Sequence, residues 1–227
     1  MRKPLLMNEK MRFEGRGFSL LELLVVVVII TILMTMGAMG IRNLTGGKST
    51  STAIANAEAV FAEARATAIG KGTSTRILIN ANDINDQNNY LRKILVAAQD
   101  LNEDGTLKTT WSLTSRGYTL PDGTFYSAKF SKKNAAGADP MTPEELTFTK
   151  ASDSGKYVVY EFNNQGICKT PGATFVIGGG ARPKGKEPLI SGAAKRDFAG
   201  FTIWGNGETS TFRNTTQIGD LTAVKNF

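Results

Sequence analysis

Apolar residues form one long run near the start of the chain. Every residue from Phe18 to Met39 is apolar, glycine or hydroxyl-bearing, apart from Glu22. A helix of about 20 such residues covers a bilayer core of about 30 Å. Each Leu, Ile, Val or Phe favours membrane insertion by about 0.3–0.6 kcal/mol. An acid costs about 2.5–3.5 kcal/mol at the membrane centre, but Glu22 is near one end of the run, where the cost is smaller. The run therefore predicts a transmembrane helix over 18–39.

Glycines follow this run at Gly37, Gly40, Gly46 and Gly47. Each glycine in a helix interior costs about 1 kcal/mol relative to alanine. We therefore expect a flexible or locally unwound linker after residue 39.

A second helical pattern begins after the capping cluster at 49–51. Its apolar residues recur at helical spacing, with charged residues elsewhere. They are Ile54, Ala57, Phe61, Ala64 and Ala68. The pattern predicts an amphipathic helix that ends near Gly70 or Gly72 and packs its small apolar stripe on a sheet, so that 40–72 comprises linker and helix.

Short β patterns with turn residues between them occupy 73–227. The candidate strands are Thr75–Ile79, Tyr90–Ala98, Lys108–Leu113, Thr124–Phe130, Leu146–Phe148, Tyr157–Phe162, Ala173–Ile177 and Gly200–Trp204. No helix-length pattern separates them, which argues against a parallel α/β fold. The predicted fold class is α+β: a long N-terminal helix, transmembrane and then amphipathic, packed on one antiparallel β domain.

Charge changes the interpretation of the first 17 residues. The chain of 227 residues has a net charge of +7, and five basic and two acidic residues give residues 1–17 a net +3, leaving +4 for the rest. Basic residues beside an apolar segment keep that flank in the cytoplasm. The leader at 1–17 is therefore expected inside, and the β domain outside the cytoplasmic membrane.

The composition excludes several kinds of covalent link, metal site and catalytic site. Cys168 is the only cysteine and the chain has no histidine. An intrachain disulfide, a cysteine-built metal site and histidine-dependent catalysis are therefore excluded. No serine or threonine has a base at an informative spacing, so we expect a protein that is not an enzyme.

Three interpretations of the N-terminus compete. A secretory signal would be cut after Gly37, Ala38 or Gly40, but its apolar region usually has about 7–15 residues and this one is longer. A plain membrane anchor would leave Glu22 as an interfacial residue. The third interpretation comes from Gly17-Phe18-Ser19-Leu20-Leu21-Glu22, which resembles the processing motif of type IV pilins and type II secretion pseudopilins.

The resemblance implies roles for three residues. A prepilin peptidase would cut between Gly17 and Phe18 and N-methylate Phe18, and Glu22 would pair with the free N-terminal amine of a neighbouring subunit. Physical chemistry agrees, because an acid in apolar surroundings must be neutralised or paired. The alternative, a Glu22 without such a partner among the lipid headgroups, stays open.

Weaker similarity extends into the β domain. The segments 63–69, 75–79, 111–125 and 162–166 are similar to H-type minor pseudopilins and related minor pilins. This resemblance implies a pilin-like subunit of the bacterial inner membrane, with other pilin or pseudopilin subunits and secreted cargo as partners. Secretion systems, pili and competence systems share such leaders, so the machine is not identified.

A calcium site is a further candidate. Asp100, Asn102 and Asp104, followed by Gly105, match the start of a calcium loop, in which alternate side-chain oxygens surround the cation. Trp111 stands where a bidentate glutamate would close that loop. The competing interpretation is a hairpin turn, which Asp-Gly favours; if calcium binds, these three residues are the expected ligands, and no other cofactor is expected.

Two basic segments of the chain are the last candidate binding sites. The sequence of residues 180–187 is close to a P-loop motif. However, Glu187 stands where the motif has Ser or Thr, and Pro183 lacks the backbone amide hydrogen that would bind phosphate. A solvated basic loop is therefore the better interpretation. The last quarter combines basic residues with aromatic ones, namely Lys184, Lys186, Lys195, Arg196, Arg213 and Lys225 with Phe198, Phe201, Trp204 and Phe212. That mixture fits DNA binding or an ordinary sheet. A membrane-anchored module that binds DNA or calcium is thus the alternative function.

Overall fold

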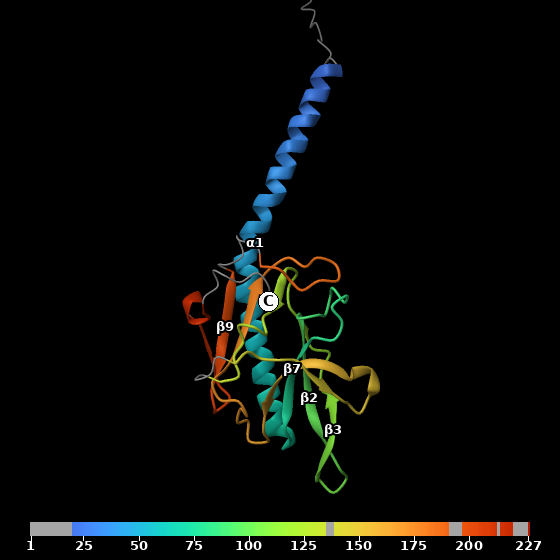
Figure 1. Ribbon diagram of the computed structural model, residues 1–227, viewed down its shortest axis with the longest axis vertical. Coiled ribbons are helices and arrows are strands. Elements are labelled where there is room, and N and C mark those ends of the chain that lie inside the picture. Colours follow the sequence, from blue (N-terminus) through green and yellow to red (C-terminus); the bar gives the residue numbers. More distant parts are fainter. Residues whose placement is uncertain (1–19, 135–138, 191–196, 213, 220–226) are drawn as a thin grey trace, which may run out of the picture. The chain divides into compact units, whose positions relative to one another are not determined.

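The computed structural model describes residues 20–134, 139–190, 197–212, 214–219 and 227, with the backbone alone for residues 32–49. The chain divides into two units, residues 1–43 and 44–227, and each is described by itself. The element order is one long helix followed by β-strands (Figure 1). The α+β fold class expected from the sequence is confirmed.

Helix α1 runs from Leu20 to Lys71 without interruption. The expected unwinding near Gly37–Gly47 is therefore wrong. Four glycines cost about 4 kcal/mol together, but starting a second helix costs about as much, since a nucleation constant near 10⁻³ corresponds to about 4 kcal/mol. A break would also lose hydrogen bonds, so the continuous helix is favoured. Among the described residues, no helix combines the length and the apolar character that crossing a membrane requires.

The amphipathic part of α1 is confirmed. Its predicted stripe is buried, comprising Ile54, Ala57, Phe61, Ala64 and Ala68. The helix ends in a Schellman motif: the Gly72 amide donates to the Ile69 carbonyl and the Thr73 amide to the Ala68 carbonyl. Gly72 has a φ of 65°, which glycine adopts without a Cβ clash.

The larger sheet, sheet A, has six strands in the order β3-β2-β1-β7-β6, with β4 paired to β2. All described pairs in it are antiparallel. Its strands are β1 (Thr75–Asn80), β2 (Lys93–Leu101), β3 (Leu107–Leu113), β4 (Tyr118–Thr119), β6 (Glu144–Leu146) and β7 (Gly155–Phe162), with a short 3₁₀ helix, η1 (Ala151–Asp153), between β6 and β7. Strand β1 lies between β2 and β7, with Ile77 opposite Val96 on one side and Tyr160 on the other.

The smaller sheet, sheet B, has four antiparallel strands in the order β10-β9-β8-β5. They are β5 (Thr124–Tyr126), β8 (Ala173–Gly179), β9 (Phe198–Ile203) and β10 (Thr209–Thr211). A second 3₁₀ helix, η3 (Thr215–Gln217), follows and is closed by a capping box between Asn214 and Gln217.

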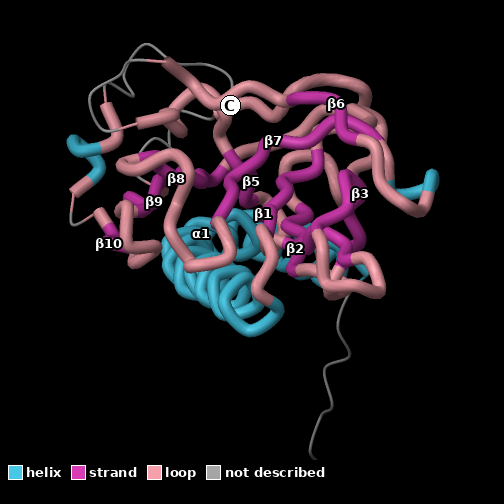
Figure 2. The backbone as a smooth tube through the Cα atoms, turned by 90° about the horizontal axis from the view of Figure 1, so that it is seen from below, coloured by secondary structure: helices cyan, strands magenta, loops and turns pink. Residues whose placement is uncertain are grey.

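The main core joins α1 to the inner faces of both sheets. Figure 2 shows the labelled strands of both sheets gathered along one side of α1. Phe61 of α1 is at the centre of this core, with its ring centroid 5.2 Å from Tyr160, 5.1 Å from Phe201, 5.5 Å from Phe175 and 6.4 Å from Phe162. These edge-to-face contacts link the helix to β7, β8 and β9, which explains why the amphipathic stripe needs both sheets.

Two smaller apolar clusters pack elsewhere on the sheets. On sheet A, Leu78, Leu95 and Trp111 pack with Phe148 from the segment after β6. On sheet B, Phe198 stacks on Phe227, with 5.5 Å between the ring centroids. Each of these sheet surfaces is thus partly covered by a connecting segment or by the last residue.

Candidate functional site

Among the residues that the structure describes, the first turns of α1 carry the largest group of exposed apolar side chains. Every side chain from Leu20 to Thr31 is exposed, and the large apolar ones range from 45% exposed at Val26 to 88% at Leu20. In the unit formed by residues 44–227, by contrast, the large apolar side chains of α1 point mostly into the core. A helix that is apolar all round is normally buried in a protein or a membrane. This segment therefore requires an apolar environment from outside the described chain.

Two polar groups lie within this apolar segment. Glu22 is in the first turn of α1, where the helix dipole favours an acid. Thr31 donates its hydroxyl to the Val27 carbonyl at 2.8 Å. A threonine bonded to its own helix adds no exposed donor, so Glu22 is the one ionisable group among residues 20–31. The predicted processing residues Gly17 and Phe18 lie outside the described residues.

Residues 15–38 match the prokaryotic N-terminal methylation motif. This match includes Gly17, Phe18 and Glu22, and it supports a type IV pilin-like family. The motif implies processing by a prepilin peptidase and assembly with other pilins. It ends before the β domain. No curated protein and no solved structure matches the chain.

Beyond the methylation motif, Asp100 of the predicted calcium loop lies on β2 and accepts two hydroxyl hydrogen bonds. Thr110 and Thr149 each donate to its Oδ2 atom at 2.7 Å. Burial acts to raise the pKa of Asp100, but hydrogen bonds from Thr110, Thr149 and Ser112 outweigh it and lower that pKa. The carboxylate is therefore stabilised as an anion by the protein's own hydroxyls.

The other two predicted ligands are in the tight turn between β2 and β3. Asn102 donates to the Thr106 hydroxyl at 2.7 Å, and Asp104 accepts from that hydroxyl at 2.6 Å. Gly105 takes a φ of 81°, so the hairpin interpretation is confirmed. Within the described residues, no three His, Cys, Asp or Glu side chains come together as metal ligands. Calcium binding by Asp100, Asn102 and Asp104 stays a prediction.

The loop at 180–187 is partly packed against the protein, which corrects the expectation of a solvated loop. Arg182 donates to the backbone carbonyls of Asp86, at 2.8 Å, and Ile84. Its guanidinium also lies 4.8 Å from the centre of the Tyr90 ring. Tyr90 in turn donates to Glu187 at 3.0 Å.

Burial and the Glu187 hydrogen bond raise the pKa of Tyr90 to about 12. The sequence does not reveal this contact, because Tyr90 and Glu187 lie 97 positions apart and no local pattern links them. Lys184 and Lys186 of the same loop remain exposed.

Most of the aromatic residues that suggested DNA binding belong to apolar clusters. Phe201 is buried in the main core, and Phe198 and Phe212 pack in the cluster on sheet B. Trp204 alone among these four is exposed, at 48%, and it donates to Ser210 at 2.8 Å. Of the basic residues proposed with them, Lys195, Arg196, Arg213 and Lys225 lie outside the described residues. Base stacking on Phe198 or Phe201 is therefore blocked by burial.

Proposed function

We propose that the chain is a minor pilin or H-type pseudopilin-like subunit. A prepilin peptidase cuts it between Gly17 and Phe18 and methylates Phe18. The mature protein is then held in the bacterial inner membrane by its first helix, as a single-pass protein with the β domain on the extracytoplasmic side. Its role is structural, in a type II secretion pseudopilus or a type IV pilus.

The observation that carries this proposal is the exposed apolar surface of α1 from Leu20 to Thr31. Before assembly, lipid covers such a surface. In a filament, the helices of neighbouring subunits cover it. The methylation motif lies on the same helix, which supports processing and helix packing as two steps of one assembly route.

Glu22 gives the assembly its register. In the filament its carboxylate pairs with the methylated amine of Phe18 from a neighbouring subunit. An acid surrounded by apolar helices is stable only when neutralised or paired. The pair therefore favours one axial position of each subunit relative to the next. The β domain contacts partner subunits or secreted cargo.

Substitution of Glu22 tests this proposal. Glu22→Ala should still be inserted and cut, because the processing residues and the apolar run are unchanged, but should be lost from sheared filaments. Glu63→Ala is the matched control, since Glu63 is an exposed glutamate on the same helix. Both proteins are quantified by immunoblot in membrane and filament fractions. Incorporation of Glu22→Ala at the level of Glu63→Ala would refute the pairing role.

A further inference from the structure

A cavity of about 400 Å³ lies on sheet A, at the end where β1 and β3 finish and β7 begins. It is on the face that bears Leu95 and Tyr157, away from the main core. Binding sites for small ligands commonly have volumes of about 300–1,000 Å³. The cavity is therefore large enough for a compact ligand.

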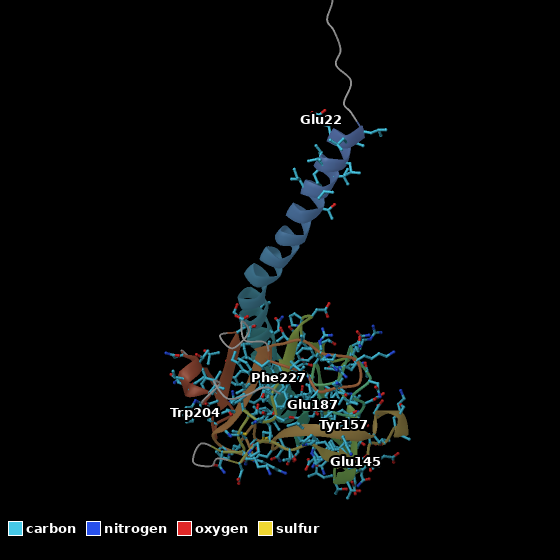
Figure 3. All side chains as sticks on the ribbon, turned by 45° about the horizontal axis from the view of Figure 1, so that its top comes forward. Glu22, Glu145, Tyr157, Glu187, Trp204 and Phe227 are labelled. Atoms are coloured by element: carbon cyan, nitrogen blue, oxygen red, sulfur yellow. The ribbon has the colours of Figure 1, made fainter. Side chains whose placement is uncertain are left out.

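Two of the side chains that line the cavity are almost completely buried: Leu95 is 6% exposed and Tyr157 is 3% exposed. Leu95, Leu113 and Tyr157 contribute to its lining; Tyr157 is labelled in Figure 3. The Tyr157 hydroxyl donates to the Asp153 carbonyl at 2.7 Å, and the ring packs edge-on against Phe148, with 5.9 Å between centroids. The position of this ring is thus set by the protein before any ligand binds.

Two cations border the cavity. They are Lys93 of β2 and Arg116 of the segment between β3 and β4. Within the described part of the chain, neither side chain forms an ion pair, whereas Arg65, Arg76 and Arg92 each do. Their hydrogen-bonding capacity is therefore available to a ligand.

The backbone around Arg116 is held on both sides. Before it, the Thr114 amide donates to the Val96 carbonyl at 2.8 Å. After it, Gly117 has a φ of 76°, and a Cβ there would lie 2.3 Å from the Ile94 carbonyl oxygen. Strand β4 then pairs with β2. The segment is fixed in place, so Arg116 starts from a defined position at the cavity's edge.

The remaining lining is polar and mostly uncharged. Asn80, Asn82 and Asn89 supply amides, and Asp153 is the single acid against the two cations. We propose that this cavity binds a hexose-sized saccharide that carries one anionic group. The sugar's hydroxyls bond to the amides and Asp153, and its anionic group is held by Arg116 and Lys93. This binding is independent of the proposed assembly role.

Titration calorimetry of the detergent-solubilised full chain tests the proposal with three probes. Glucuronate and glucose 6-phosphate carry the two common anionic groups, and glucose is the neutral control. We expect dissociation constants on the order of 1 mM for at least one anionic probe, and binding at least about tenfold weaker for glucose, which is the effect of one charged hydrogen bond. Binding of only one anionic probe identifies the anionic group.

Substitutions test whether the probes bind in this cavity. Arg116→Gln and Lys93→Gln should each weaken it by about tenfold. Lys129→Gln removes the same charge from an exposed lysine in the connection after β5 and should leave it unchanged. Circular dichroism checks that each variant is folded. The proposal is overturned if neither anionic probe binds at about 10 mM, if glucose binds equally well, or if the Arg116 and Lys93 variants match Lys129→Gln.

Discussion

Replacing Phe61 by alanine tests the packing of α1 on the two sheets. Phe61 is fully buried, and its ring contacts aromatic rings from β7, β8 and β9. Removal of a buried phenylalanine costs about 3–5 kcal/mol. Edge-to-face ring pairs add about 0.5–1.5 kcal/mol each beyond the buried area, so we expect a loss near the top of that range.

The assay is thermal unfolding of the detergent-solubilised full chain, followed by near-ultraviolet circular dichroism. For a domain of about 150–250 residues, each kcal/mol lowers the melting temperature by about 2–4 °C. A loss of about 5 kcal/mol, at the top of that range, should therefore make Phe61→Ala melt about 10–20 °C below the wild type. Ile69→Ala is the control, because Ile69 is on the same helix but is 52% exposed. A loss below about 1 kcal/mol for Phe61→Ala, or an equal loss for Ile69→Ala, would show that the main core is not organised around Phe61.

Two further predictions concern a glycine and a tyrosine. Gly117→Ala should lower the free energy of unfolding by about 1–3 kcal/mol in urea titrations, and by more than Gly105→Ala. Both glycines have positive φ, but an added Cβ at Gly117 would lie 2.3 Å from the Ile94 carbonyl oxygen, whereas one at Gly105 would meet no atom within 4 Å. Equal losses for the two variants would contradict this prediction. The pKa of Tyr90 is raised from 10.0 to about 12 by burial and by its hydrogen bond to Glu187. The folded state therefore keeps a proton that the unfolded state loses, so stability falls as pH rises from about 10 to about 12. In urea titrations across that range, Tyr90→Phe should lose less stability than the wild type, and parallel pH profiles would contradict the shift.

The strands that could be predicted from the sequence are those with a clear alternating pattern. In β1, Ile77 and Ile79 face the main core while Leu78 belongs to the cluster on the other face. The period of two in a strand requires this separation. Strands β4 and β10 were missed because, at two and three residues, they are too short to show a period.

Element ends were less predictable because tertiary contacts set them. The strand expected to begin at Tyr90 begins at Lys93, since Leu91 has a φ of 53° and its amide and carbonyl bond to Asn80 and Tyr126 outside β2. The polar cavity could not be predicted either. Its lining comes from segments as distant as Asn80 and Tyr157, and these two residues meet only because β1 pairs with β7.

The N-terminal motif is the part of the candidate site that the sequence revealed most fully. A local pattern suffices there, because a peptidase recognises neighbouring residues and does not need a folded surface. Glu22, Gly17 and Phe18 lie within six positions of one another. The β domain carries no comparable local signature, so its partners depend on surfaces that only the fold assembles.

Processing as a prepilin is tested most directly by the mass and N-terminal sequence of the protein purified from the membrane of a host that makes prepilin peptidase. The mature chain is predicted to begin at Phe18 and to carry one methyl group on its amine. A chain that still begins at Met1, or one that begins near residue 40, would contradict it.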